Sequence, residues 1–268
     1  MQKFTLKLLI LAFLLTLPKT LLGIDSLAKT ALIMDLSTGE ILLEKNSEER
    51  TYPSSMTKIM TALVAFEKIK NGTLAIDQEF LISKKAWKMG GSKMFIEVDK
   101  KVTLSDLLLG IVVQSGNDAS IAVAEGISGT EETFAIEMNN LGKKIGLTGT
   151  NFVNSSGWPN DDHYTTAKDL ALVAKYTIEN HPELYQMYSL TEFTYNGIKQ
   201  DNRNPLLLTF EGADGFKTGY TQAAGYGLVG SAERGDRRLI IVLNGLESSR
   251  SRAQESLRLM DWGFNNFE

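Results

Sequence analysis

The sequence predicts an α+β fold in which one antiparallel sheet is flanked by helices and a helical lobe is inserted between its strands. Two observations support this prediction. Apolar, β-rich runs occur near both ends of the chain, and the middle, from about 103 to 180, has the periodicity of helices. Because such terminal strands can share one sheet, we expect them to pair, with the first and last helices packed on the sheet. A cleft between the two lobes is then the expected ligand site.

The bulk composition is that of one globular domain. The 268 residues are 43% hydrophobic and 22% charged, a mixture typical of folded proteins. A net charge of −4 without a long basic run gives no reason to expect nucleic acid as a partner. The lack of cysteine excludes disulfides and thiolate metal sites, and Asp161, Asp162 and His163 have no second histidine at ligand spacing. We therefore expect no metal and no other cofactor.

The first 23 residues have the layout of a secretory signal peptide. Lys3 and Lys7 precede the apolar run 8–17, and small or polar residues follow it. This run is short for a stable membrane span. Leu21 is large for a cleavage site, so an uncleaved anchor is the alternative. We expect an exported protein of the periplasm or cell envelope, in which 24–268 form a single domain of two lobes.

The domain is predicted to begin with a β-hairpin that leads into a helix. Two β-rich runs, 30–34 and 40–43, are separated by the turn sequence Asp-Leu-Ser-Thr-Gly. A Tyr-Pro-Ser segment then interrupts the chain, and Ser55 opens a helix. Apolar residues recur on one face of this helix until Asn71 and Gly72 end it.

The remaining elements complete the two predicted lobes. The sheet lobe is expected at about 24–70 and 206–268, and the helical lobe at about 71–205. Helical periodicity in the second lobe covers 104–113, 118–127, 131–145 and 166–178. The sheet lobe resumes with strand patterns and a final amphipathic helix, at 214–218, 227–232, 238–243 and 249–262.

Three short motifs indicate the chemistry, and the first is Ser55-Met56-Thr57-Lys58. It places a hydroxyl and an amine three residues apart at a helix start, where they share one face and can come within hydrogen-bond reach. A serine hydroxyl becomes a nucleophile when a nearby base accepts its proton, and an uncharged lysine can be that base. Ser-x-x-Lys is common by chance. Ser115-Gly116-Asn117 and Lys217-Thr218-Gly219, following in that order, make the signal specific.

With these three motifs the sequence resembles the penicillin-binding D-alanyl-D-alanine carboxypeptidases. The resemblance extends from about Ala28 to Phe264. It includes the segments 35–39, 53–61, 114–119, 202–206 and 214–221. It implies the fold of β-lactamases and transpeptidases, and removal of the last D-alanine from peptidoglycan stem peptides ending in D-Ala-D-Ala through an acyl-enzyme. It also implies acylation by β-lactam antibiotics. Larger relatives carry a C-terminal β-domain and an anchoring helix, and here we expect at most a peripheral contact with a membrane.

The resemblance and the residue chemistry agree on the catalytic group. Ser55 is the expected nucleophile and Lys58 its base. Because free lysine titrates near pH ~10.4, Lys58 has to be buried, and we expect Lys217 to be the neighbouring cation that lowers its pKa further. Ser115 is placed to relay a proton to the departing D-alanine, and Asn117 to fix the geometry with its amide.

A second group is expected to bind the substrate. Lys217, Thr218 and Arg203 are cationic or hydroxylic groups suited to the terminal carboxylate. The edge of the strand through Gly219 can hold the peptide by main-chain hydrogen bonds. By resemblance, the backbone N–H groups of the nucleophilic serine and of Tyr220 form the oxyanion hole. Many relatives have histidine at the position of Tyr220, so we expect an altered substrate fit with activity retained.

Three alternatives remain open. A DD-endopeptidase of the same family is poorly separated by sequence. A serine β-lactamase needs a carboxylate that activates the deacylating water, and only partial matches to that segment begin at Glu137 and Glu192. A non-catalytic peptidoglycan-binding protein would leave each motif with a plain structural role. Ser54 or Ser55 would cap a helix, Lys58 would be solvated, Asn117 would cap the next helix, and Lys217 would be a strand-edge charge.

Overall fold

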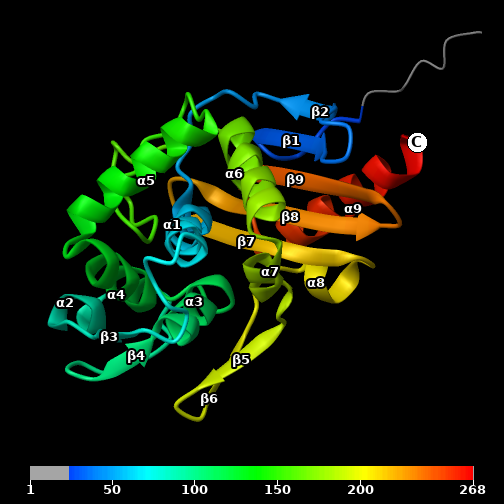
Figure 1. The fold of residues 1–268 in the computed structure, drawn as a ribbon. Coiled ribbons are helices and arrows are strands. Elements are labelled where there is room, and N and C mark those ends of the chain that lie inside the picture. The colour runs from blue at the N-terminus through cyan, green and yellow to red at the C-terminus, as the bar shows by residue number, and fades with distance from the viewer. Residues whose placement is uncertain (1–23, 268) are drawn as a thin grey trace, which may run out of the picture.

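The computed structural model describes residues 24–267, and its centre is a five-stranded antiparallel sheet (Figure 1). The strand order is β2–β1–β9–β8–β7, so strands from both ends of the chain are neighbours. In the β1–β9 pair, Ala31 lies opposite Leu243. The strands are β1 Thr30–Asp35, β2 Ile41–Lys45, β7 Ala213–Thr221, β8 Gly225–Arg234 and β9 Arg237–Leu246. The predicted α+β class, with terminal strands in one antiparallel sheet, is confirmed.

Both faces of the sheet are covered by helices. Successive side chains of a strand point to opposite faces, so an inner strand contributes to two hydrophobic clusters. Leu32 and Met34 of β1 join the same hydrophobic cluster as helices α1 and α6, whereas Ile33 joins the cluster that includes α9. In β9, Ile240 and Ile241 divide in the same way. The sheet is therefore the middle of three layers (Figure 1). The covering helices are α1 Lys58–Lys70 and α6 Ala167–Asn180 on one face, and α8 Leu206–Thr209 and α9 Ser249–Asn266 on the other.

The segment between α1 and β7 has a helix at each of the four places where the sequence predicts one. Thr103, Thr130 and Thr166 cap α3, α5 and α6, because each side-chain hydroxyl accepts a hydrogen bond from a backbone N–H of the first turn. Helices α3, α4 and α5 pack against α1, whereas α6, within the range expected for the helical lobe, packs against β1 and β9. The other elements are α2 Lys84–Lys88, α3 Leu104–Val112, α4 Asn117–Ser128, α5 Glu131–Ile145, α7 Pro182–Tyr185 and η2 Gln186–Ser189.

Two small two-stranded sheets were not predicted. They are β3 Glu79–Leu81 with β4 Lys101–Thr103, and β5 Glu192–Tyr195 with β6 Ile198–Asp201. Each strand has three or four residues and buries one of them, so no alternating pattern is long enough to be recognised. Asn196 and Gly197 between β5 and β6 both have positive φ, 48° and 75°. Asn-Gly is the preferred sequence for such a hairpin turn, so this signal was present in the sequence and was overlooked.

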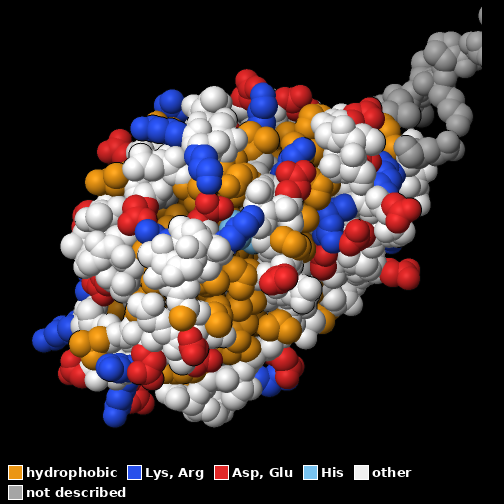
Figure 2. Space-filling view, in the orientation of Figure 1, with side chains coloured by type: hydrophobic (Ala, Val, Ile, Leu, Met, Phe, Trp, Pro, Cys, Tyr) orange, Lys and Arg blue, Asp and Glu red, His pale blue; other side chains and the backbone are white. Residues whose placement is uncertain are grey.

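The surface charge and the helices of the described residues relate to the expectations about nucleic acid and membranes. Basic and acidic side chains are interspersed on the face shown in Figure 2, with hydrophobic side chains visible between them near its centre. Within residues 24–267, no helix is both long enough and apolar enough to cross a membrane. The predicted signal peptide at 1–23 lies outside the described residues.

Candidate active site

Ser55 lies in a 3-10 turn, η1 Ser54–Thr57, that leads directly into α1. Pro53 is the N-cap residue of this turn, and no side chain caps it. Neither Ser54 nor Ser55 is therefore a helix cap, the role that the non-catalytic alternative would give them. The turn packs against β7, the edge strand that carries Lys217. Ser54 Oγ donates a hydrogen bond of 3.2 Å to Thr221 Oγ1 at the end of β7. The turn therefore presents Ser55 between the first helix and the edge of the sheet.

Lys58 is completely buried, with 0% of its surface exposed, and its amine reaches three acceptors. Nζ donates to Ser55 Oγ at 3.1 Å, to Asn117 Oδ1 at 2.7 Å and to the backbone carbonyl of Ser156 at 2.6 Å. The predicted hydrogen-bond reach between Lys58 and Ser55 is confirmed. The carbonyl of Ser156 was not predicted, because a backbone group leaves no signature in the sequence.

Burial lowers the pKa of Lys58 from 10.5 to about 7, because a charged amine loses its hydration in the protein interior. The cation of Arg203 lowers this pKa further, while Asp118 and Glu131 raise it. Arg203 was not expected to act on Lys58, whereas the expected neighbour, Lys217, is coupled to Lys58 through the charges of the two amines. Lys217 has a pKa well below its usual range for the same reasons, first its own burial and then the charge of Lys58.

The motif Ser115-Gly116-Asn117 forms the turn between α3 and α4. Ser115 has a φ of 67°, a left-handed conformation that is costly for a residue with a Cβ and that recurs at functional sites. Asn117 is the first residue of α4, whose N-cap is Gly116, so its side chain does not cap the helix. The Asn117 amide instead accepts from Lys58 and donates to the carbonyl of Gly90 at 2.8 Å.

Asp118 was missed by the sequence analysis, although it follows the second motif directly. Its buried carboxylate accepts hydrogen bonds from the backbone N–H groups of Met94 at 2.9 Å and Phe95 at 3.0 Å. The N–H of Asn117 donates to the carbonyl of Ser92 at 2.7 Å. These contacts fix the loop before β4 beside the second motif. An acidic residue in the first turn of a helix was the available signal.

The third motif lies on β7 at the free edge of the sheet. Lys217 and Thr218 are buried, so Lys217 is not a solvated edge charge. Lys217 Nζ donates to the carbonyl of Thr218 at 3.1 Å. Gly219 follows in the same strand, and Tyr220 is 53% exposed with its ring against that of Tyr226, 4.2 Å between centroids. The strand therefore presents a buried cation and an exposed aromatic ring beside the serine.

Two arginines add positive charge to this region. Arg203, which precedes α8, donates to Ser92 Oγ at 2.6 Å. Arg252 of α9 is only 9% exposed, and its Nε has no hydrogen-bond partner among residues 24–267. Both arginines lower the pKa of Lys217, so both positive charges act at the position of the Lys217 amine. Such a concentration of cations suits an anionic group of a ligand. Arg252 was missed because it reads as one more charge on an amphipathic helix.

The residues considered for a β-lactamase or for a metal site make other contacts. Glu137 pairs with Lys68 at 2.7 Å, and Glu192 pairs with Lys199 at 2.6 Å on the β5–β6 hairpin. His163 is buried against η1. Its Nδ1 accepts from the N–H of Val153 at 3.1 Å, which leaves Nε2, 2.8 Å from Thr57 Oγ1, as the protonated donor. No group of three or more His, Asp or Glu residues suited to a metal ion occurs in 24–267.

Comparison with known proteins gives relatives over most of the chain. The model of the family described as D-alanyl-D-alanine carboxypeptidase matches residues 19–247. D-alanyl-D-alanine carboxypeptidase DacC of Escherichia coli (strain K12) is 41% identical over 248 residues, and DacF of Bacillus subtilis (strain 168) is 39% identical over 254 residues. Each match covers 90% of this chain, and 62% and 63% of the respective relative. The chain thus spans less than two thirds of the length of these relatives.

Crystal structures of similar proteins share the fold. D-alanyl-D-alanine carboxypeptidase DacD of Francisella tularensis has a TM-score of 0.89 and 37% identity, over 91% of this chain and 71% of that one. Penicillin-Binding Protein D2 of Listeria monocytogenes, in its ampicillin-bound form, has a TM-score of 0.82 and 31% identity, over 89% and 98%. The fold and the three clustered motifs therefore define a protein of the penicillin-binding, transpeptidase-like class. The chain belongs to the D-alanyl-D-alanine carboxypeptidase family.

Proposed function

We propose that this protein is a serine D-Ala-D-Ala carboxypeptidase that removes the terminal D-alanine from peptidoglycan stem peptides. One observation carries the proposal: the buried amine of Lys58, with a pKa of about 7, lies 3.1 Å from Ser55 Oγ. An uncharged amine at that distance can accept the hydroxyl proton and make the serine a nucleophile. The named activity of the relatives supports the same reaction.

In the proposed acylation step, Ser55 Oγ attacks the carbonyl carbon of the D-Ala–D-Ala peptide bond while Lys58 takes its proton. Negative charge then develops on the carbonyl oxygen. The backbone N–H groups of Ser55 and Tyr220 are the proposed donors to this oxyanion. Such a donor typically contributes about 10²–10³ to the rate. Asn117 holds the amine of Lys58 in place through its side-chain oxygen.

The leaving D-alanine needs a proton, and Ser115 is the proposed relay. Ser115 is buried and stands two residues before Asn117, whose side-chain oxygen contacts Lys58, and this supports the assignment. Loss of D-alanine leaves an ester on Ser55, and attack by water on this ester completes the hydrolysis. A general acid that protonates the leaving group, as proposed for Ser115, typically contributes a factor of about 10²–10⁴ to the rate.

Recognition of the substrate carboxylate is assigned to the cations and hydroxyl on the sheet side. Lys217, Thr218 and Arg203 are the groups inferred from the sequence, and the buried, incompletely paired Arg252 joins them. The free edge of β7 at Gly219 offers main-chain hydrogen bonds to the peptide. The exposed ring of Tyr220 borders this edge and is expected to influence which substrates fit.

The experiment that tests the proposal is mass spectrometry of the protein after exposure to a β-lactam, first intact and then digested with trypsin. One ring-opened molecule should add to the tryptic fragment that holds Ser55, and Ser55→Ala should remove the label. Wild-type protein should also release D-alanine from a peptide ending in D-Ala-D-Ala. Noncovalent binding without labelling would favour a peptidoglycan-binding role, and cleavage of crosslinked peptides without D-alanine release would favour an endopeptidase.

The lifetime of the acyl-enzyme distinguishes the β-lactamase alternative. Glu137 and Glu192 are held in ion pairs away from the motifs, so we propose that neither activates a deacylating water. The penicilloyl adduct should therefore persist, and rapid steady turnover of penicillin in a stopped-flow assay would contradict this.

Export to the periplasm or cell envelope, with a peripheral membrane contact, is proposed from residues 1–23 of the sequence. Lys3, Lys7 and the apolar run 8–17 support it. Fusion of this segment to a reporter that is active only outside the cytoplasm tests export, and an inactive reporter would contradict it.

A further inference from the structure

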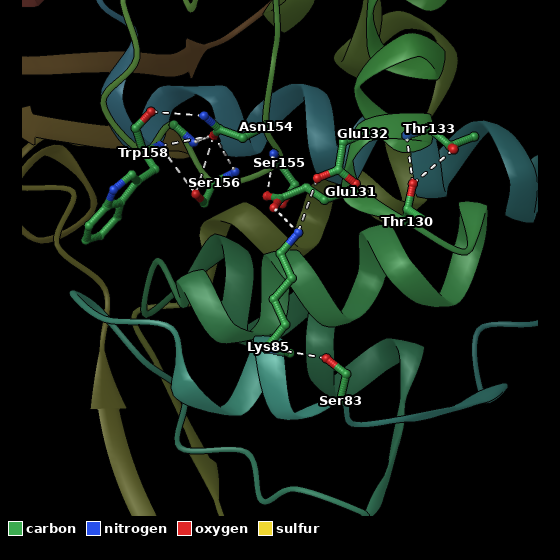
Figure 3. A network of polar contacts seen from close by, with 12 residues as sticks. Ser83, Lys85, Thr130, Glu131, Glu132, Thr133, Asn154, Ser155, Ser156 and Trp158 are labelled. Atoms are coloured by element: carbon green, nitrogen blue, oxygen red, sulfur yellow. Dashed lines mark hydrogen bonds and ion pairs between the residues drawn. The ribbon is translucent and has the colours of Figure 1, made fainter.

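The Ser156 carbonyl that contacts Lys58 belongs to a turn that is held by a buried carboxylate, Glu131 (Figure 3). Glu131 is the first residue of α5, and its side chain is 11% exposed. Its Oε1 accepts hydrogen bonds from both the N–H of Ser155, at 3.1 Å, and the hydroxyl of Ser155, at 2.7 Å. Its Oε2 pairs with Lys85 Nζ of α2 at 3.0 Å. One carboxylate therefore connects two helices with the residue that precedes Ser156.

The turn at 154–158 is also fixed by neighbouring groups. Asn154 Oδ1 accepts from the N–H groups of Gly157 at 2.8 Å and Trp158 at 3.0 Å, which closes the turn on itself (Figure 3). Thr61 Oγ1 of α1 donates to the carbonyl of Ser155 at 2.6 Å. Ser155 is thus held from α1 through its carbonyl and from α5 through its N–H and hydroxyl. The next carbonyl along the chain is the one that meets Lys58.

We propose that Glu131 is a positioning residue for the Ser55–Lys58 pair, because its carboxylate holds Ser155 so that the following carbonyl stays directed at the amine of Lys58. This inference rests on the proposed function of that pair. Both oxygens of Glu131 are engaged, one with Ser155 and one with Lys85. It therefore acts on the reaction through the turn and through its charge, without contacting the substrate.

The charge of Glu131 has a separate effect on Lys58. A nearby carboxylate favours the charged amine, so Glu131 raises the pKa of Lys58, against the lowering by burial and by Arg203. The other charged or titratable groups that act on or face Lys58 are Arg203, Lys217, Asp118 and His163. Removing the charge while keeping an acceptor oxygen should therefore shift the titration of Lys58 to lower pH. Removing the positive partner of Glu131 should shift it to higher pH.

The test compares three variants of the full chain. Glu131→Gln keeps an oxygen for Ser155 and removes the charge, and Lys85→Met removes the paired cation. The matched control is Glu132→Gln, the same change at the next residue, where the side chain is 77% exposed and 3.6 Å from Lys85. The readouts are the ¹³Cε titration of Lys58 by NMR, assigned with Lys58→Arg, and the pH profile of acylation by a fluorescent penicillin.

We expect Glu131→Gln to move the Lys58 midpoint and the acidic limb of acylation down by about half a pH unit or more, and Lys85→Met to move both upward. Glu132→Gln should leave both in place. An unmoved midpoint in Glu131→Gln together with an unchanged acylation rate would overturn the proposal, as would an equal shift in Glu132→Gln. Should Glu131→Gln fail to fold, Lys85→Met, which changes a half-exposed side chain, provides the test. An upward shift of the Lys58 midpoint in this variant would support the proposal, and no shift or a downward shift would overturn it.

Two further outcomes distinguish a positioning role of Glu131 from a direct role in hydrolysis and from a failure of the proposed function. If Glu131→Gln slows only the hydrolysis of the acyl-enzyme and leaves the acylation profile in place, Glu131 activates water and the positioning role is wrong. If β-lactams do not acylate the wild-type protein, the proposed function is wrong. The NMR midpoint, which needs no turnover, then still decides whether Glu131 acts on Lys58.

Discussion

Lys58 owes its reactivity to the kind of acceptors that surround it. Its three hydrogen-bond partners are a hydroxyl, an amide oxygen and a backbone carbonyl, all of them neutral. Neutral acceptors satisfy the N–H groups of a buried amine but do not offset the lost hydration of its charge as a contacting carboxylate would. The acidic residues that raise its pKa, Asp118 and Glu131, use their oxygens on backbone groups or on Lys85 instead. The amine is therefore well placed and easily deprotonated.

Acylation should depend on pH through Lys58. Because the base is the neutral amine and its pKa is about 7, the rate should rise as the pH passes this value and then level off. Below it, the rate should fall about tenfold per pH unit. The measurement is the second-order rate of labelling by a fluorescent penicillin from about pH 5 to about pH 9.

Lys58→Arg is the control for this pH dependence. Arginine keeps its proton throughout the range and cannot act as the base, so labelling should be lost at every pH. A wild-type rate that does not change between about pH 5 and about pH 8 would exclude Lys58 as the titrating base.

Single residues differ in how well the sequence predicts them. Ser55 and Lys58 were paired correctly because helical spacing is local, and three residues along a helix fix their distance. Asn117 contacts Lys58 through its side-chain amide, the group expected to fix the geometry. The carbonyl of Ser156 and the buried guanidinium of Arg252 come from distant parts of the chain, and no local pattern announces them. The action of Arg203 on Lys58 was not foreseen for the same reason.

At the scale of elements, the turn at 154–158 and the serine turn η1 fit closely together. Gly157, with a φ of 78°, lies where an added Cβ would be 1.7 Å from the carbonyl oxygen of Ser54 and 2.8 Å from Thr57 Oγ1. Only a residue without a Cβ can occupy this position without moving η1. The position of the nucleophile therefore depends on a turn about a hundred residues later in the chain.

Gly157→Ala should damage both stability and acylation. The added methyl group has to displace the backbone of η1, at a cost of about 2–3 kcal/mol beyond the strain at positive φ. The control is Gly129→Ala, which has a φ of 77° and no atom within 4 Å of its added Cβ. It should show the conformational strain alone, about 1–3 kcal/mol. Urea unfolding and penicillin labelling measure the two effects, and equal losses in both variants would show that the clash is relieved without moving the serine.

Elements were predictable where their pattern was long enough to repeat. The long strands and the helices were found because several buried residues recur at a fixed spacing, as in β9 and α1. The predicted final strands cover the centres of β7, β8 and β9 and miss their ends, most of which are more exposed and carry less apolar signal. The short strands β3 and β4 bury too few residues to show a period. The place of α6 on the sheet depends on tertiary packing that its own periodicity does not specify.

For the whole molecule, one hydrophobic cluster joins the sheet to the helical segment. It contains Leu32 of β1, Val229 of β8 and Ile240 of β9 together with residues of α1, α3, α4, α5 and α6. Phe216, next to Lys217, also belongs to it, with its ring 4.9 Å from that of Tyr188 in η2. Because this cluster lies directly behind the three motifs, loss of packing in either lobe should disturb the site. We propose on this basis that 24–268 unfold as one domain.

The three tryptophans allow this proposal to be tested. Trp87 lies in α2 of the helical segment and Trp262 in α9 on the sheet, while Trp158 lies in the turn beside the site. Two single-tryptophan proteins, one keeping only Trp87 and the other only Trp262, are made with phenylalanine at the remaining positions. If the shared core makes unfolding two-state, both fluorescence transitions in urea should have the same midpoint and slope, and each should coincide with the loss of far-ultraviolet circular dichroism of the same variant. A separation of the two fluorescence midpoints by more than about 0.5 M urea, with the circular dichroism of each variant falling in two steps, would mean that the lobes unfold independently. The site between the first helix, the turn at 154–158 and β7 would then be assembled from two separately stable units.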